Sequence, residues 1–124
     1  MNKISFCTVC RNRLEYVRQT LPVNIRENAA YENVEFVLLD YNSPDGLEEW
    51  VKSEMKQHIE SGILKYYKTT EPDHFKMSHS KNMALKLGSG DIITQLDADN
   101  YAGFKYAHWL NQVFSQKGKN TLVT

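Results

Sequence analysis

Short segments rich in β-branched and aromatic residues alternate along this chain with longer segments of helical character. This alternation is typical of a mainly parallel sheet covered by helices, because parallel neighbours need a long crossover connection. The expected strands are Ile4–Val9, Val34–Asp40, Leu64–Lys68, Asp91–Leu96 and Thr121–Thr124, and the expected helices are Leu14–Asn28, Pro44–Ser61, Ser78–Leu87 and Gly103–Lys117. A chain of 124 residues has the usual size of one domain, so we expect residues 1–124 to form a single α/β unit.

The helix expected at Pro44–Ser61 has recognisable start and stop signals. Asn42 or Ser43 can cap its first turn, Pro44 suits the first helical position and Gly62 suits the residue after the end. Its apolar residues recur every four positions, at Leu47, Val51, Met55 and Ile59. This spacing predicts one apolar stripe that lies on the sheet.

The charge balance excludes some classes of partner. Lys and Arg together number 15, as do Asp and Glu, so the formal net charge is zero. A neutral chain is a poor binder of nucleic acid, and no apolar run approaches the roughly 20 residues of a membrane span. We therefore expect a cytoplasmic protein with no transmembrane segment and no nucleic-acid partner, in which any bound anion is met by a few local cations.

The only two cysteines, Cys7 and Cys10, have the C-x-x-C spacing of redox pairs and of half zinc sites. A redox motif normally opens a helix after its strand, whereas these two residues lie within or at the end of an expected strand. A zinc site would need two further ligands, and the sequence has none at usable spacing. We therefore expect buried or strand-end thiols in a reducing compartment.

Acidic residues follow two of the expected strands. Asp40 ends one strand and Asp97 follows another, and ligands of open α/β sheets bind beyond the carboxyl ends of strands. Asp97 and Asp99 form a D-x-D pair with Asn100 beside it, and alternate residues of an extended chain share a face. Paired carboxylates suit Mg²⁺ or Mn²⁺, which prefer oxygen ligands. The pattern equally fits a solvated turn whose Asp caps the helix that begins near Gly103.

Three blocks carry a resemblance to a known family, and their order along the chain is that of the family. They are Thr8-Val9-Cys10-Arg11-Asn12-Arg13, then Val37-Leu38-Leu39-Asp40-Tyr41-Asn42-Ser43-Pro44-Asp45, then the segment from Ser80 to Asn100 with Lys81-Asn82, Gly88-Ser89-Gly90-Asp91 and Asp97-Ala98-Asp99. The chain resembles the nucleotide-sugar-binding half of family 2 glycosyltransferases, which have the GT-A fold. The resemblance implies a three-layer α/β/α Rossmann-like domain with a mainly parallel sheet.

The same resemblance implies a role for particular residues in binding a nucleoside diphosphate sugar, with a UDP-sugar favoured. Thr8, Cys10 and Arg11 would border the nucleotide, Asp40 would accept hydrogen bonds from the base with Asn42 beside it, and Lys81 would meet the base or the pyrophosphate. Asp97 would approach the ribose and, with Asp99, ligate the Mn²⁺ or Mg²⁺ that bridges the diphosphate. Lys81 stands where the family usually has Arg, and Lys lacks the bidentate fork of Arg.

Several alternatives remain open at this point. Family members usually continue beyond the metal loop to an acceptor-binding region and a catalytic base, but no carboxylate follows Asp99 here. We expect either a truncated chain or a naturally short one, and a possible homodimer or strand exchange that hides an exposed sheet edge. The acceptor, a sugar or glycan, is unknown.

The alternative function is a non-catalytic nucleotide-binding or assembly domain that lacks the acceptor half. A nucleotidyltransferase is disfavoured, because no Gly-rich basic loop follows the first strand.

Overall fold

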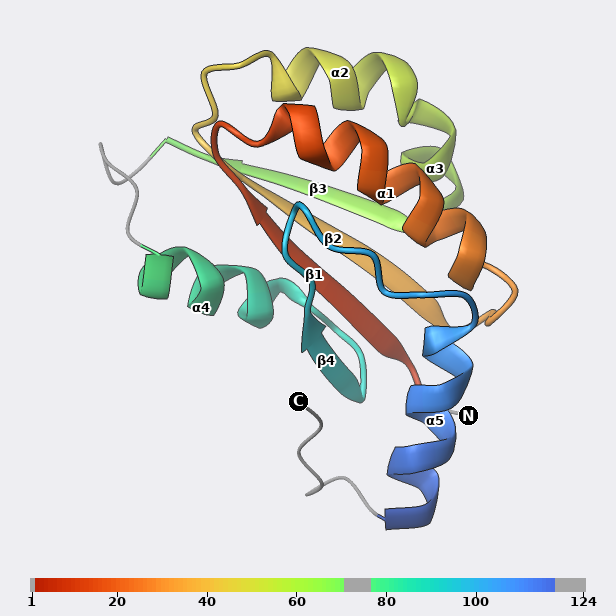
Figure 1. Ribbon diagram of the computed structural model, residues 1–124. Coiled ribbons are helices and arrows are strands. Elements are labelled where there is room, and N and C mark those ends of the chain that lie inside the picture. Colours follow the sequence, from red (N-terminus) through yellow and green to blue (C-terminus); the bar gives the residue numbers. More distant parts are fainter. Residues whose placement is uncertain (1, 71–76, 118–124) are drawn as a thin grey trace.

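Four parallel strands form one sheet in the order β3-β2-β1-β4 in the computed structural model, which describes residues 2–70 and 77–117 (Figure 1). The strands are β1 (Ile4–Cys10), β2 (Val34–Tyr41), β3 (Leu64–Thr69) and β4 (Ile92–Gln95). β1 is central and pairs in parallel with both β2 and β4, and β2 pairs in parallel with β3. The sequence therefore predicted this part of the sheet correctly, whereas the strand expected at Thr121–Thr124 lies outside the described residues.

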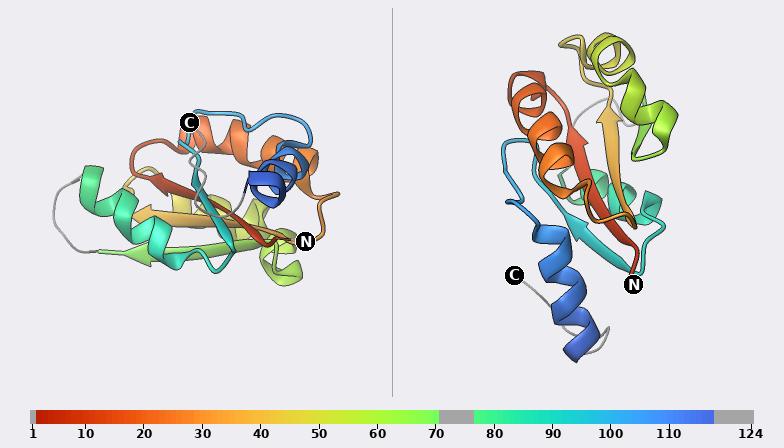
Figure 2. Two further views of the ribbon diagram at one scale, coloured as in Figure 1. Left: turned by 90° about the horizontal axis from the view of Figure 1, so that it is seen from below. Right: turned by 90° about the vertical axis from the view of Figure 1, so that its right-hand side faces the viewer.

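Helices cover both faces of this sheet. They are α1 (Leu14–Asn28), α2 (Leu47–Glu54), α3 (Lys56–Ser61), α4 (Met77–Leu87) and α5 (Tyr106–Lys117). Figures 1 and 2 show α1 and α2 on one face and α4 on the other. α5 joins the α1 face, where its Ala107 and Leu110 enter the core. The three-layer α/β/α arrangement is thus confirmed. No helix within residues 2–70 and 77–117 is long and apolar enough to cross a bilayer.

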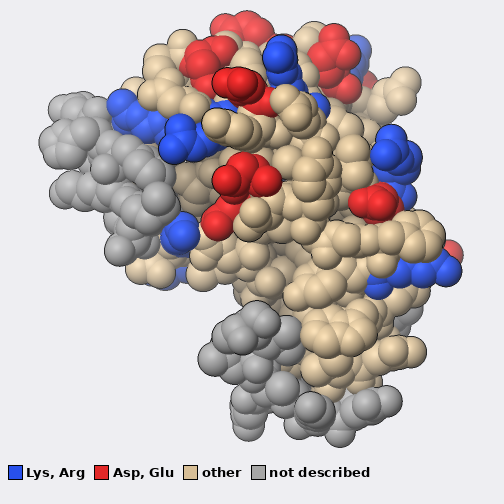
Figure 3. Space-filling model, viewed as in Figure 1, with Lys and Arg blue, Asp and Glu red and all other residues tan. Residues whose placement is uncertain are grey.

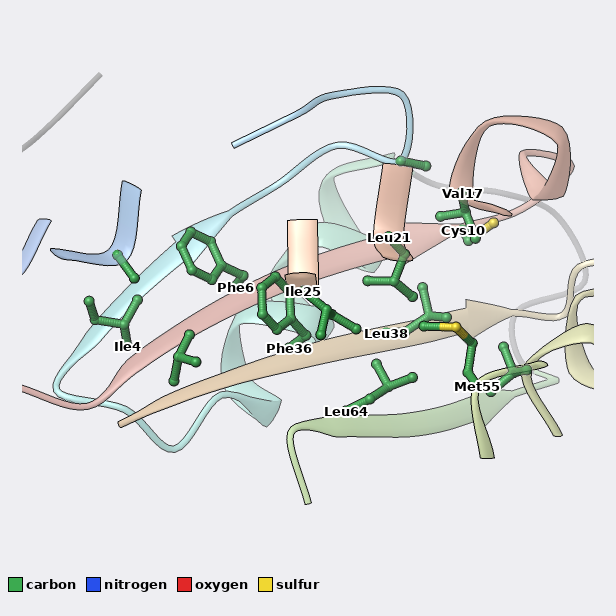
Figure 4. Close-up of a cluster of buried hydrophobic side chains, with 14 of the residues drawn as sticks. Ile4, Phe6, Cys10, Val17, Leu21, Ile25, Phe36, Leu38, Met55 and Leu64 are labelled. Carbon is green, nitrogen blue, oxygen red and sulfur yellow. The ribbon is translucent and has the colours of Figure 1, made fainter. Parts of the chain in front are cut away.

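Alternate residues of the central strands supply two separate layers of core. Phe6 and Phe36 stack on one face with ring centroids 5.1 Å apart, and Leu21 and Ile25 of α1 belong to the same buried cluster (Figure 4). The opposite face has its own cluster, which includes Cys7, Val37, Leu39 and Tyr41 of the sheet and Ala84 of α4. Burial on both faces explains why the β2 segment is almost continuously apolar, as is usual for central parallel strands.

The two thiols lie within β1 and face opposite sides of the sheet. Cys7 packs in the cluster under α4, whereas Cys10 packs in the cluster under α1. Both are free and fully buried, and burial is the main reason that the pKa of each thiol is raised to about 12. The expectation of buried thiols is confirmed, and neither side chain is a reactive thiolate at neutral pH.

The single helix expected at Pro44–Ser61 was wrong in two respects. The helical region starts at Leu47, after Gly46 in the left-handed region at φ 87°, and no side chain caps α2. The chain also breaks at Met55, whose φ of −110° separates α2 from α3. Because the break interrupts the four-residue repeat, Ile59 is 37 % exposed whereas the three preceding members of the stripe are buried.

Most other boundaries differ from the expected ones by a residue at most, and two of the differences bear on the candidate site. The helix expected from Gly103 begins at Tyr106, because Gly103 (φ 105°) and Lys105 (φ 60°) have left-handed backbone that cannot continue a right-handed helix. Strand β4 ends at Gln95, although the amide of Leu96 still donates to Cys7 O at 2.9 Å. The chain then turns away from the sheet, and this turn shapes the candidate site.

Candidate functional site

A pocket of about 410 Å³ lies at the carboxyl ends of β1 and β4. Its lining residues are Val9, Arg11, Asn12, Arg13, Lys81, Gln95, Asp97, Ala98 and Asp99. This is the edge at which open α/β sheets bind ligands, and the volume is within the usual range for small-molecule sites. Figure 3 shows acidic and basic side chains next to each other on the face seen in Figure 1. The lining itself combines cationic side chains with carboxylates.

The two acids of the D-x-D pair belong to a turn. The amide of Asn100 donates to Asp97 O at 3.0 Å, so that residues 97–100, hereafter the acidic turn, fold back after β4. Our premise that Asp97 and Asp99 alternate along a strand was therefore wrong, yet both side chains line the same pocket. The alternative interpretation as a turn describes the backbone correctly, but α5 begins at Tyr106, too far along the chain for Asp99 to cap it.

Asp97 is held from two sides. Gln95 Nε2 donates to its Oδ1 at 2.9 Å, and Lys81 Nζ lies 3.8 Å from the same oxygen. The Lys81 and Asp97 side chains are 34 % and 50 % exposed, so the ion pair is weak and solvent-screened. Lys81 comes from α4 and Asp97 from the acidic turn, so the fold alone brings the two together. A ligand anion can recruit this ammonium group at little cost.

Arg11 contributes the most unusual group in the pocket lining. Its Nη1 is buried and has no hydrogen-bond partner among the described residues. A buried donor without a partner is costly, and a bound anion would satisfy it. The next residue, Asn12, has left-handed backbone at φ 57°, and its amide donates to Ser43 Oγ at 2.9 Å. This bond from the β2–α2 loop holds the backbone that follows β1.

Asp40 is fully buried and lies outside the pocket lining. Its Oδ1 accepts a hydrogen bond from the Ser43 amide at 2.7 Å, and its Oδ2 accepts one from the Tyr66 hydroxyl at 2.5 Å. Burial, together with this bond, raises the pKa of Tyr66, which therefore stays a neutral donor. Asp40 is thus buried and already bound within the fold, although each carboxylate oxygen can accept a further hydrogen bond.

Three further residues expected at the donor site also lie outside the pocket lining. Thr8 is buried, and its Oγ1 donates to Leu96 O at 2.7 Å, immediately before the acidic turn. Cys10 is fully buried in the core, and Asn42 is half-buried with left-handed backbone at φ 53°. Of the sequence-predicted site residues, the fold thus brings together Arg11, Lys81, Asp97 and Asp99.

Comparison with known proteins identifies the family. The sequence model of glycosyl transferase family 2 matches residues 5–114. The chain belongs to this family. A comparison with curated proteins found no match.

Solved structures of glycosyltransferases share the fold. The mannosyltransferase PcManGT from Pyrobaculum calidifontis, in complex with GDP-Man and Mn²⁺, superposes with a TM-score of 0.69 at 24% identity, over 84% of this chain and 29% of that chain. S. aureus TarS 1-349, in complex with UDP, gives 0.69 at 19% identity, over 93% and 32%. GalNAc-T7 with UDP, GalNAc and Mn²⁺ gives 0.60 at 16% identity, over 79% and 18%. This chain therefore spans less than a third of the length of these three proteins.

The pocket of this family 2 chain offers a partial ligand set for a divalent metal. Asp97 and Asp99 are the only carboxylates among its described lining residues, and residues 2–70 and 77–117 hold no group of three or more His, Cys, Asp or Glu that could bind an ion. Asp99 is exposed and makes no hydrogen bond or ion pair with a described residue. Two carboxylates fit Mg²⁺ or Mn²⁺ when phosphate oxygens and water complete the shell. They do not form a closed metal cage.

Sequence reasoning missed several lining residues of this family 2 pocket. Gln95 ends β4 and its amide donates to Asp97, whereas in the sequence it is only a polar residue of an expected strand. Arg13 belongs to the first of the three family blocks, which gives it no role of its own. Val9, Asn12 and Ala98 line the pocket with small or neutral groups, and no sequence signal distinguishes them from structural residues.

Proposed function

We propose that this chain binds the nucleoside diphosphate part of a sugar donor and is the donor-binding part of a metal-dependent glycosyltransferase. One observation carries the proposal: the carboxylates of the acidic turn line the same pocket as Arg11 and Lys81, at the carboxyl ends of β1 and β4. Family membership supports it, as does the likeness to solved structures that contain GDP-Man with Mn²⁺ or UDP.

The charges of the pocket suit a diphosphate with a metal ion. Among the described lining residues, Arg11, Arg13 and Lys81 carry three positive charges against two negative charges on Asp97 and Asp99, a net charge of +1. Asp99 and Asp97 would hold Mn²⁺ or Mg²⁺, which when bound stabilises the negative charge that develops on the departing diphosphate. Arg11 would donate a hydrogen bond from its buried Nη1 to a phosphate oxygen. Lys81 would leave its ion pair with Asp97 and pair with a phosphate instead.

The residues expected at the donor site but outside the pocket lining are proposed to act indirectly. Thr8 holds the strand end before the acidic turn through Leu96 O. Asp40 holds the Ser43 amide, and Ser43 in turn accepts the amide of Asn12 in the pocket wall. Cys10 and Asn42 would shape the same wall through packing and backbone conformation.

The proposal is tested by calorimetric titration of UDP, and separately of GDP, with and without Mn²⁺. We expect Mn²⁺ to strengthen binding of one nucleotide, and the Asp99→Ala variant to lose at least about tenfold in metal-dependent affinity, or about 1.4 kcal/mol. Glu60→Ala on α3 is the matched control, because it removes an exposed carboxylate far along the chain from the acidic turn and should bind like the wild type.

The outcomes separate the competing functions. Metal-dependent binding that disappears only in Asp99→Ala supports a donor site and justifies assays of sugar transfer to candidate glycan acceptors. If neither nucleotide binds under either condition, the proposal is wrong, and the chain is better described as a non-catalytic assembly domain.

We also propose that the chain forms a homodimer through β4. β4 is an edge strand of the described sheet, and its Ile93 is 43 % exposed. An exposed apolar edge is a template for pairing with another strand. Sedimentation should therefore show a concentration-dependent dimer, and a monomer at every concentration would count against this interface.

A further inference from the structure

Helix α1 carries three buried polar residues at four-residue spacing: Thr20, Asn24 and Asn28, hereafter the polar ladder. Their side chains are 5 %, 1 % and 0 % exposed. Residues four apart share one face of a helix, so the ladder is a stripe beside the apolar stripe that packs on the sheet. Buried amides and hydroxyls destabilise a fold unless they are hydrogen-bonded, so the partners of the ladder indicate what it does.

The first two members of the ladder bind the backbone of the acidic turn. Thr20 Oγ1 donates to Ala98 O at 2.6 Å, and Asn24 Nδ2 donates to Asn100 O at 3.1 Å. These carbonyls belong to the two residues that flank Asp99. The backbone on both sides of this acid is therefore attached to one rigid helix.

The rest of the ladder holds the chain that leads from the turn to α5. Asn24 Oδ1 accepts the Ala102 amide at 2.8 Å, Asn28 Nδ2 donates to Gly103 O at 3.2 Å, and Asn28 Oδ1 accepts the Ala107 amide at 2.8 Å. This segment has no regular secondary structure before α5, so its backbone groups need partners from outside. Helix α1 supplies them.

We propose that the polar ladder positions the acidic turn, so that Thr20 and Asn24 determine the metal dependence of nucleotide binding without contacting the ligand. The inference rests on the proposed function and adds positioning residues to it. A carboxylate on a loose turn would ligate a metal weakly, because ligand geometry must be held by its supporting groups. The ladder provides this support for Asp99, whose own side chain has no described hydrogen bond.

The test compares three variants of the full 124-residue chain. Thr20→Val removes the hydroxyl but keeps the branched shape, and Thr20→Ser keeps the hydroxyl. Val17→Ala, at a fully buried position of the same helix, removes packing but no ladder bond. The readout is the gain in UDP or GDP affinity that Mn²⁺ produces. We expect the gain in Thr20→Val to be at least tenfold smaller than in the wild type, while the affinity measured without metal changes less than twofold. Thr20→Ser and Val17→Ala should keep the gain within about threefold.

A second measurement separates this inference from the proposed function. The Asn100 amide bonds Asp97 O within the acidic turn, so its hydrogen exchange, followed by NMR without any ligand, reports the order of the turn. Thr20→Val should exchange this amide at least threefold faster than the wild type or Thr20→Ser. An unchanged exchange rate in Thr20→Val would overturn the positioning role. So would an unchanged gain in nucleotide affinity on addition of Mn²⁺. If the wild type binds no nucleotide, the proposed function fails, and the exchange comparison still decides whether the ladder holds the turn.

Discussion

Glu35 is a buried carboxylate in the apolar strand β2, and its replacement by Gln should lower stability in a pH-dependent way. The side chain is 2 % exposed. Lys65 Nζ lies 2.8 Å from its Oε1, while Ser5 Oγ and the Ser89 amide donate to its Oε2 at 2.5 Å and 2.7 Å. Through these contacts Glu35 of β2 is linked to β1, to β3 and to the loop before β4, at the amino-terminal end of the sheet.

The magnitude follows from the pKa of this carboxyl group. Burial alone would raise the pKa, but the bonds from Lys65, Ser5 and Ser89 outweigh burial and lower it from 4.5 to about 2. Each tenfold change in proton affinity corresponds to about 1.4 kcal/mol, so the pKa change is equivalent to roughly 3 kcal/mol. Lys65 is 38 % exposed, so solvent screens its contribution. We therefore expect Glu35→Gln to cost about 2 kcal/mol at pH 7.

The sign of the pH dependence is set by the lowered pKa. A carboxyl group whose pKa is depressed in the folded state stabilises fully above its unfolded pKa, and this contribution is lost as the pH falls. For Glu35 the loss occurs between about pH 4.5 and about pH 2. Urea unfolding of the wild type and of Glu35→Gln, measured from pH 7 downward, should show a stability difference that shrinks across this window.

A difference between the two proteins that stays constant from pH 7 to pH 3 would refute this reasoning. The matched control is Glu48→Gln, because Glu48 is likewise paired with lysine, to Lys52 and Lys68 at 3.1 Å each. The Glu48 side chain is 32 % exposed, and surface ion pairs contribute little to stability. The control should therefore unfold at nearly the same urea concentration as the wild type.

Two shorter predictions concern the strand edge and the loop before β4. A Cβ at Gly90 would lie 2.6 Å from Lys3 O, so Gly90→Ala must displace backbone. We expect the variant to lose about 1–3 kcal/mol of stability and to unfold at a lower temperature than the wild type. An unchanged midpoint of thermal unfolding would contradict the contact. Ile93→Lys places a charge on the exposed edge strand β4. The variant should form less dimer in sedimentation at matched protein concentration, with an unchanged circular dichroism spectrum. Sedimentation like that of the wild type would argue against pairing through β4.

Sequence patterns predicted the elements well where burial alone decides them. A strand was expected at Val34–Asp40, and residues 34–41 form one that is buried along its whole length. The expected helix Leu14–Asn28 has the observed boundaries of α1. Such predictions succeed because the period of apolar residues records which face of an element is covered. The helix expected at Pro44–Ser61 failed because its start and its break depend on backbone angles at Gly46 and Met55.

The order of strands and helices along the chain and the family resemblance can be read from the sequence, as can the positions of Arg11 and the acidic pair just beyond strand ends. The contact between Lys81, inside α4, and Asp97 depends on the fold. Contacts between distant segments could not be read in this way: Tyr66 and the Ser43 amide donate to Asp40, and Thr20 donates to Ala98 O, 78 positions away. Local patterns encode burial because each residue's environment repeats with the period of its element. Hydrogen bonds between distant segments depend on how those elements pack, and a linear pattern carries no record of that packing.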